Sequence, residues 1–207
     1  MIAYERARAS DLAAIANLYQ DSFPEALSAV FGRPRLPDSA VEDVFALLYK
    51  EEPGGFEVAR DDGKLVGCVV SVRSFADLKR RLLRRGLRRL AARWLRGRYR
   101  GLGLGWIPRL AQAAWRYRQA DAAAAEDPDP AQMLTAIVAS SHRGQGIGAH
   151  LIERSLASLK ISRVKSVRLE VDAAKPGPIH LYRKLGFREI ARIPTPRGPA
   201  LVLSRPL

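Results

Sequence analysis

The chain has 207 residues, of which 47% are hydrophobic, and its 35 basic and 21 acidic residues give a net charge of +14. This length can bury the core of one domain, and the composition excludes a globally disordered chain. No run of about 18 apolar residues predicts a membrane span, and charges interrupt the N-terminal segment where a secretory signal needs apolar residues. The single cysteine, Cys68, excludes an internal disulfide. We therefore expect a cytoplasmic protein, and the excess of arginine over lysine, 28 to 7, is typical of a GC-rich bacterial genome.

The positive charge is concentrated in one part of the chain. Residues 73–118 contain 15 basic residues and a single acid, Asp77, whereas the remainder contains 20 basic and 20 acidic residues. The sequence therefore predicts one roughly neutral domain spanning residues 1–207, into which a strongly basic segment is inserted. We call residues 76–127 the basic insertion.

The segment before the basic insertion predicts two strands and a hairpin around helical segments. Residues 2–8 alternate as a strand, and Ser10 is a candidate N-cap for a helix that ends near Phe23. A second helix is predicted over residues 38–50. The segments FEVAR and KLVGCVVSVRSF flank Asp-Asp-Gly, which is a strong signal for a β-hairpin. Within the second of these strands, Cys68 is best interpreted as a small buried hydrophobic residue.

The basic insertion has the pattern of two amphipathic helices. Leucines and Trp94 recur at helical spacing from Phe75 to Leu95, with arginines on the other face. A glycine-rich stretch interrupts this pattern, a helical pattern resumes over 109–126, and the prolines of DPDP at 127–130 end it. We predict a helical hairpin between two strands.

After the insertion, strands and helices alternate. QMLTAIVA predicts a buried strand, and it leads through the loop HRGQGIG (142–148) into a helix with an apolar stripe from Ile147 to Leu159. SVRLEVD, GFREIARI and ALVLSR predict strands, and PIHLYRKL predicts a short helix starting at Pro178. This order indicates a mixed α/β fold with at least one parallel crossover.

The loop HRGQGIG has the features of a phosphate-binding site. A strand that turns through closely spaced glycines into a helix exposes unpaired backbone N–H groups, and the helix dipole adds partial positive charge. Such a site suits a phosphate or pyrophosphate. The spacing G-x-G-x-G excludes the dinucleotide fingerprint G-x-G-x-x-G, and no Gly-Lys-Ser/Thr follows that would make a P-loop.

Two stretches resemble the GNAT superfamily of acyl-CoA N-acyltransferases. VASSHRGQGIGAHLI is similar to the family's motif A, with Arg143, Gly146 and Gly148 in its diagnostic positions, and LEVDAAKPGPIHLYRKLGF is similar to the following strand and LYxKLGF helix. The resemblance is specific over residues 133–193 and does not include the basic insertion. The chain departs from the family pattern at Ser140, Lys175 and Pro178, where proline, asparagine and alanine are common.

The resemblance implies a GNAT-like mixed central β-sheet flanked by helices, with a basic helical-hairpin insertion, and acetyl-CoA as co-substrate. Backbone groups near Ile137 and Val138 would pair with the pantetheine arm and the thioester, and Lys175 would face the coenzyme as a charge. The resemblance assigns the pyrophosphate to the loop residues Arg143, Gly144, Gln145, Gly146, Ile147 and Gly148.

Two residues are candidates for the proton transfers of such a reaction. Tyr182 resembles the family's tyrosine that protonates the leaving thiolate, and a phenol near pKa ~10 and a thiol near ~8.5 are close enough for that transfer. The pattern alone favours a core tyrosine on a helix face, and only the LYRKLGF context favours the acid role. Glu170, twelve residues earlier, resembles the base of the ribosomal-protein N-terminal acetyltransferases. The alternative is a solvated strand carboxylate paired with Arg168.

The acceptor expected from these residues is a primary amine. A protein or peptide α-amine is slightly favoured by the spacing of Glu170, and at pKa ~7.7–8.0 it loses its proton more easily than lysine at ~10.4. Three histidines and one cysteine form no metal-ligand pattern, and no Ser/His/Asp signature is present. The oligomeric state is not indicated by the sequence.

Three interpretations of the basic insertion remain open. Its amphipathic helices cover the sheet or the substrate cleft, or they lie on an anionic membrane surface, or they bind nucleic acid or an acidic protein. No nucleic-acid motif accompanies the arginines, so sequence-specific recognition of bases is not expected. These interpretations also define a non-enzymatic alternative, a GNAT-like docking module for an anionic partner.

Overall fold

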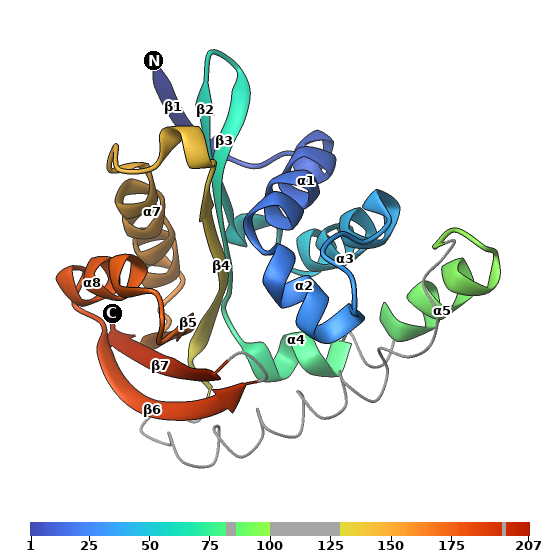
Figure 1. Cartoon of the computed structure of the whole chain (residues 1–207). Helices are drawn as coiled ribbons and strands as arrows, with labels where there is room; N and C mark the ends of the chain where they lie inside the picture. Colours follow the sequence, from blue (N-terminus) through green and yellow to red (C-terminus); the bar gives the residue numbers. More distant parts are fainter. Residues whose placement is uncertain (82–85, 100–128, 196–197) are drawn as a thin grey trace.

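One mixed β-sheet organises the chain in the computed structural model, which describes residues 1–81, 86–99, 129–195 and 198–207 (Figure 1). Its strands lie in the order β1-β2-β3-β4-β5-β7-β6. Neighbouring strands are antiparallel except β4 and β5, which are parallel. This sheet confirms the predicted mixed α/β fold. The strands are β1 (Ile2–Arg6), β2 (Phe56–Asp61), β3 (Lys64–Val72), β4 (Ala131–Val138), β5 (Ser166–Asp172), β6 (Arg188–Thr195) and β7 (Gly198–Pro206).

Helices cover both faces of this sheet (Figure 1). One face is buried beneath a core that includes Ile15, Phe45 and Phe56, and the other beneath a core that includes Leu151 and Leu169. Both cores are apolar, so burial of the two sheet faces supplies the main stabilisation of the fold. The helices of the first face are α1 (Leu12–Ser22), α2 (Pro24–Phe31) and α3 (Asp38–Glu51), and those of the second are α7 (Ile147–Ile161) and α8 (Pro176–Lys184).

Strands β4 and β5 are paired only at their beginnings. Their register runs from Ala131–Val167 to Met133–Leu169 and stops there, although β4 continues to Val138. The other edge of β5 remains paired with β7 along its whole length. Beyond Met133, the edge of β4 that faces β5 therefore has no partner strand, and its backbone N–H and C=O groups are available to a ligand.

Several local predictions are confirmed, two are wrong and one helix was missed. The β2–β3 hairpin is present, with Asp62 and Gly63 at positive φ as a two-residue hairpin loop requires. Ser10 is not the N-cap of α1, because a 3-10 turn, η1 (Ala9–Asp11), precedes the helix and places Asp11 at that position. Helix α2 was not predicted. Helix α8 begins at Pro176, two residues earlier than expected.

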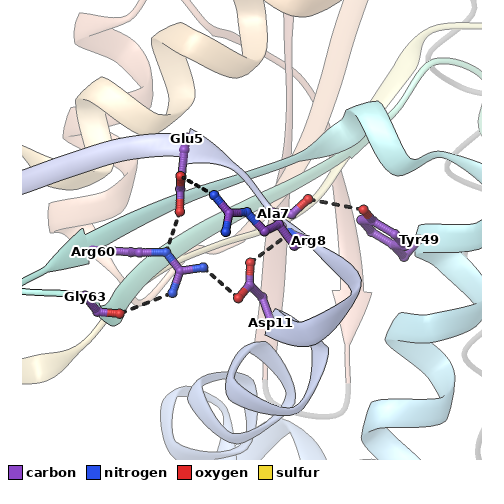
Figure 2. A network of polar contacts seen from close by, with 7 residues as sticks. All are labelled: Glu5, Ala7, Arg8, Asp11, Tyr49, Arg60 and Gly63. Atoms are coloured by element: carbon purple, nitrogen blue, oxygen red, sulfur yellow. Dashed lines mark hydrogen bonds and ion pairs between the residues drawn. The ribbon is translucent and has the colours of Figure 1, made fainter.

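A network of polar contacts holds the beginning of α1 against β2 (Figure 2). The guanidinium of Arg60 donates to Glu5 and to Asp11, each at 2.6 Å. The other oxygen of the Asp11 carboxylate accepts a hydrogen bond from the backbone amide of Arg8 at 2.8 Å. Burial by itself would raise the pKa of Asp11, but the Arg8 amide and Arg60 outweigh it and lower that pKa. The network therefore fixes the turn between β1 and the first helix.

The described part of the basic insertion is helical and is anchored to α3. It contains α4 (Phe75–Arg81) and α5 (Leu87–Leu95), whereas residues 82–85 and 100–128, including the predicted second helix of the hairpin, lie outside the described residues. Asp43 of α3 is 4% exposed and pairs with Arg93 and Arg98, and it accepts the hydroxyl of Tyr99 at 2.7 Å. Burial, and then this hydrogen bond, raise the pKa of Tyr99 to about 12. Within the described ranges, no helix is long and apolar enough to cross a membrane.

Candidate active site

The loop between β4 and α7 turns through two glycines in the left-handed region. Gly144 and Gly146 both have φ of +79°, and a Cβ at either position would meet nothing within 4 Å. Positive φ is the reason that these positions favour glycine. Gly146 is the N-cap of α7 and no side chain caps the helix, so the first amides of α7, from Ile147 and Gly148, are available. The Ile147 side chain is buried, so only its backbone can contribute to a site.

Side chains of this loop lie on its rim. The Nε of Arg143 donates to the carbonyl of Val138 at 3.2 Å, and its side chain is exposed. The amide of Gln145 contacts the Ser141 carbonyl at 3.5 Å. His142 lies 3.3 Å from Asp61 in the β2–β3 hairpin. The loop thus combines exposed glycines, free helix amides and one long cationic side chain, that of Arg143, and this combination suits a phosphorylated ligand.

The hydrogen-bonding pattern of β4 distinguishes the two backbone positions expected to contact the pantetheine arm. The amide of Ala139 donates to the carbonyl of Val66 across β3, at 2.8 Å. Antiparallel pairing alternates along a strand, so the backbone of Ile137 also faces β3 and that of Val138 faces the side of β5. The Arg143 contact agrees with this, because it uses the Val138 carbonyl. Val138 is therefore the position whose backbone is available where β4 and β5 have separated.

Tyr182 lies on α8, beside the beginning of α7. A Cβ on Gly148 would lie 3.8 Å from the neighbouring Leu181, which brings the two helices together at this loop. The Tyr182 ring packs edge-on against Phe187 with centroids 5.7 Å apart, and it is 9% exposed. Burial raises the pKa of the Tyr182 phenol to about 12, above the value of ~10 that is ordinary for a phenol. The phenol is therefore protonated throughout the physiological range.

Glu170 lies on the opposite face of the sheet from Tyr182. Val167, Leu169 and Val171 join the core beneath α7 and α8, to which Tyr182 also belongs. Side chains alternate along a strand, so Glu170 points to the face covered by α1–α3. It is also the first residue of β5 beyond the last pair with β4.

Arg168 shares that face and is only 7% exposed. Its Nε donates to Gln132 of β4 at 3.3 Å. Gln132 is itself buried, so a polar pair bridges β4 and β5 just before the strands separate. Thr135, which the sequence analysis did not single out, lies just beyond this pair on β4 and has a buried hydroxyl with no hydrogen-bond partner. Only the tertiary packing reveals that hydroxyl, because the strand pattern QMLTAIVA gives no signal for it.

Lys175 connects the two halves of the molecule. It is the N-cap residue of α8, and its Nζ lies 5.9 Å from the centroid of the Phe23 ring, at the junction of α1 and α2. Helices α1 and α8 cover opposite faces of the sheet, so this contact passes the end of the sheet where β4 and β5 have separated. Phe23 was not predicted as a site residue, since the chain pattern showed only the end of a helix there.

The described residues at this end of the sheet fit coenzyme A as a substrate. Free amides and open glycines meet the needs of a pyrophosphate, and the unpaired edge of β4 at Val138 meets those of an amide-containing arm. Among the residues that the structure describes, no group of His, Cys, Asp or Glu has the arrangement of a metal site. The sequence profile of the acetyltransferase (GNAT) family matches residues 12–187. The chain belongs to this family.

The protein is therefore an acyl-CoA-dependent N-acetyltransferase, and solved structures share its fold. The ribosomal-protein-alanine N-acetyltransferase from Brucella melitensis has a TM-score of 0.60 and 19% identity over 99% of each chain. The ribosomal-protein-S18-alanine N-acetyltransferase from Escherichia coli has a TM-score of 0.56 and 18% identity, covering 100% of this chain and 94% of the other.

The NatC complex bound to Gag peptide and CoA has a TM-score of 0.60 and 16% identity, covering 100% of this chain and 98% of the other. At such identities these likenesses concern the fold alone. No curated protein matches the sequence.

Proposed function

We propose that the protein transfers the acetyl group of acetyl-CoA directly to a primary amine, with a protein or peptide α-amine as the preferred acceptor. The observation that carries this proposal is that Tyr182 and Glu170 lie on opposite faces of the sheet, and that Glu170 is the first residue of β5 beyond its last pair with β4. A thioester that lies between the strands then has an acid on one side and a carboxylate on the other.

In this mechanism the amine approaches from the face covered by α1–α3. Glu170 accepts a proton from the ammonium or, through water, from the attacking amine. The amine nitrogen forms a bond to the carbonyl carbon, the C–S bond breaks, and the sulfur receives the proton of Tyr182. Backbone groups at Val138 are the candidates to hold the thioester arm, and Arg143 and the loop residues up to Gly148 to hold the pyrophosphate.

The raised pKa of Tyr182 supports a role as proton donor and opposes a role as base. A phenol with a pKa of about 12 stays protonated at neutral pH, so it always has a proton to give. It is also a weaker acid than the coenzyme thiol, at ~8.5, so proton transfer to the leaving sulfur is uphill by itself and must be driven by the favourable conversion of the thioester into an amide. Lys175 stays a prediction as a charge that faces the coenzyme.

The preference for an α-amine is supported by the pKa of that group and by the spacing of Glu170 from Tyr182. It is tested by an acceptor panel that follows the release of free CoA. The panel contains peptides with free N-termini, the same peptides with acetylated N-termini and one lysine, and small amines. Faster turnover with free N-termini is expected at pH 7.5, and equal or faster turnover with lysine side chains or small amines would contradict it.

A second candidate function is a docking module for an anionic membrane surface, nucleic acid or acidic protein. It is favoured by four exposed cations of α4, of α5 and of the C-cap of α5 that have no acidic partner among the described residues: Lys79, Arg88, Arg89 and Arg96. Other arginines of the insertion are paired with acids of α3, such as Asp43, which favours a packed insertion instead. Sedimentation with anionic vesicles or RNA at low and high salt, comparing the wild type with the fourfold glutamine variant, tests it.

Two further expectations stay predictions, the cytoplasmic location and the bacterial origin.

Protection by acetyl-CoA against thermal unfolding distinguishes the enzyme from a docking module that does not bind the coenzyme. A ligand bound only to the native state raises the melting temperature of the protein.

A further inference from the structure

The hydroxyl of Thr135 has no hydrogen-bond partner although it is buried. Thr135 is 9% exposed, and its Oγ1 is the one side-chain polar atom among the described residues that is both buried and unpaired. Buried polar groups in native proteins are almost always paired, because an unpaired one carries an uncompensated desolvation cost. Valine has the same shape and lacks that cost. Stability of the unliganded protein therefore does not explain a threonine at this position.

Thr135 lies at the point where the acceptor amine is proposed to enter. It is opposite Val70 on β3, and both Val70 and Ile137, two residues further along β4, belong to the core beneath α1–α3. Its side chain is therefore on the same face as Glu170. The last β4–β5 pair is Met133–Leu169, so Thr135 and Glu170 are both among the first residues beyond the separation of the strands. A register shift at Leu134 lies between the paired segment and Thr135.

We infer that the Thr135 hydroxyl binds the acceptor amine. In this role its oxygen accepts a hydrogen bond from an N–H of the amine, which leaves the nitrogen lone pair directed at the thioester carbon. The coenzyme is a less suitable partner, because its arm is proposed to lie along the backbone edge of β4, whereas the Thr135 side chain projects from the face of the sheet. The inference rests on the proposed function, and it adds the group that orients the nucleophile.

The test compares Thr135→Val with Thr135→Ser. Valine keeps the shape and removes the hydroxyl, whereas serine keeps the hydroxyl and removes a methyl group. Three quantities are measured for each variant and the wild type: the melting temperature, the rise in melting temperature with acetyl-CoA, and kcat and KM for the best amine of the acceptor panel.

We expect Thr135→Val to melt at the wild-type temperature or several degrees higher and to keep its protection by acetyl-CoA. Its kcat/KM for the amine should fall at least tenfold, and Thr135→Ser should retain most of it. A valine variant with wild-type kcat/KM overturns the inference and leaves the proposed function standing.

A valine variant that loses acetyl-CoA protection also overturns the inference, because the residue would then act on the coenzyme or the fold. A wild-type protein that releases no CoA with any amine overturns the proposed function itself. Should the valine variant fail to fold, the serine variant decides, and a tenfold loss in that variant counts against the hydroxyl.

Discussion

Replacement of Tyr182 by phenylalanine separates the two roles of this residue. It removes the hydroxyl that is proposed to act as the acid and keeps the ring that packs in the core. The substitution removes one hydroxyl and keeps the edge-on contact with Phe187, whose ring centroid lies 5.7 Å away. The folded protein should therefore lose almost no stability, within about 0.5 kcal/mol. We expect kcat to fall tenfold to a hundredfold and acetyl-CoA protection to stay unchanged, because general acid catalysis contributes about 10²-fold or more.

The size of the effect follows from the buried phenol. Burial raises the pKa of Tyr182 to about 12, and the leaving thiol has a pKa near ~8.5, so full proton transfer to a free thiolate is uphill by about 5 kcal/mol. Because this transfer is uphill, Tyr182 assists the departing sulfur less than an acid of matched pKa would, so the loss on substitution should lie at the low end of the range for general acids. A larger loss, above about 10⁴-fold, would contradict that reasoning.

The pH dependence gives an independent measurement. A phenol of pKa about 12 keeps roughly 99% of its proton at pH 10, whereas an ordinary phenol keeps about half. The wild-type kcat should therefore stay level from pH 8 to pH 10 in a stopped-time assay of CoA release. Because of the same raised pKa, the contribution of Tyr182 to folding stability is constant below pH ~10 and declines as the pH rises toward 12. Wild-type turnover in the phenylalanine variant would refute the acid role, and a wild-type kcat halved by pH 10 would refute the raised pKa.

Three further predictions concern the loop, a close backbone approach and the network of Figure 2. Gly148→Ala places its Cβ 3.5 Å from a Val138 methyl, which is an ordinary contact, so the melting temperature should not change. Calorimetry should show an affinity for acetyl-CoA that is at least tenfold weaker. Unchanged affinity would mean that no phosphate approaches Gly148. Gly55→Ala places its Cβ 1.9 Å from the Ser71 carbonyl oxygen and should cost about 3 kcal/mol or more in urea unfolding, whereas Gly54→Ala, with open space, should cost less than about 0.5. Arg60→Met should cost about 2–3 kcal/mol at pH 7, because it leaves the buried Asp11 carboxylate with one partner fewer. The pKa of Asp11 is lowered in the folded protein, so the stabilisation that this carboxylate contributes is present above pH ~3.9 and is lost as the pH falls through the folded pKa. The difference in stability between Arg60→Met and the wild type should therefore be smaller at pH 3 than at pH 7. An equal difference at both pH values would exclude the ion pair as the cause of the destabilisation.

Local signals made much of the fold predictable. The Asp-Asp-Gly turn gave the hairpin because only residues that tolerate positive φ fit it, and alternation gave the strands because their side chains face two environments. Helix α2 was not predicted because it is short and begins at Pro24, and a proline at this point indicates the end of the preceding helix as well as the start of a new one. The loop at 142–148 could be predicted as a phosphate site because glycine spacing and the following helix are both properties of consecutive residues.

The sequence by itself determined the mixed α/β fold and the family resemblance, and it predicted a pyrophosphate-type loop, since each depends on residues close together in the chain. Only the tertiary structure decided that β4 and β5 part after Met133, that Tyr182 and Glu170 lie on opposite faces, and that burial raises the phenol pKa to about 12. It alone showed the unpaired hydroxyl of Thr135. Strand register, solvent exclusion and the absence of a hydrogen-bond partner are set by residues far apart in the chain, and no local pattern records them.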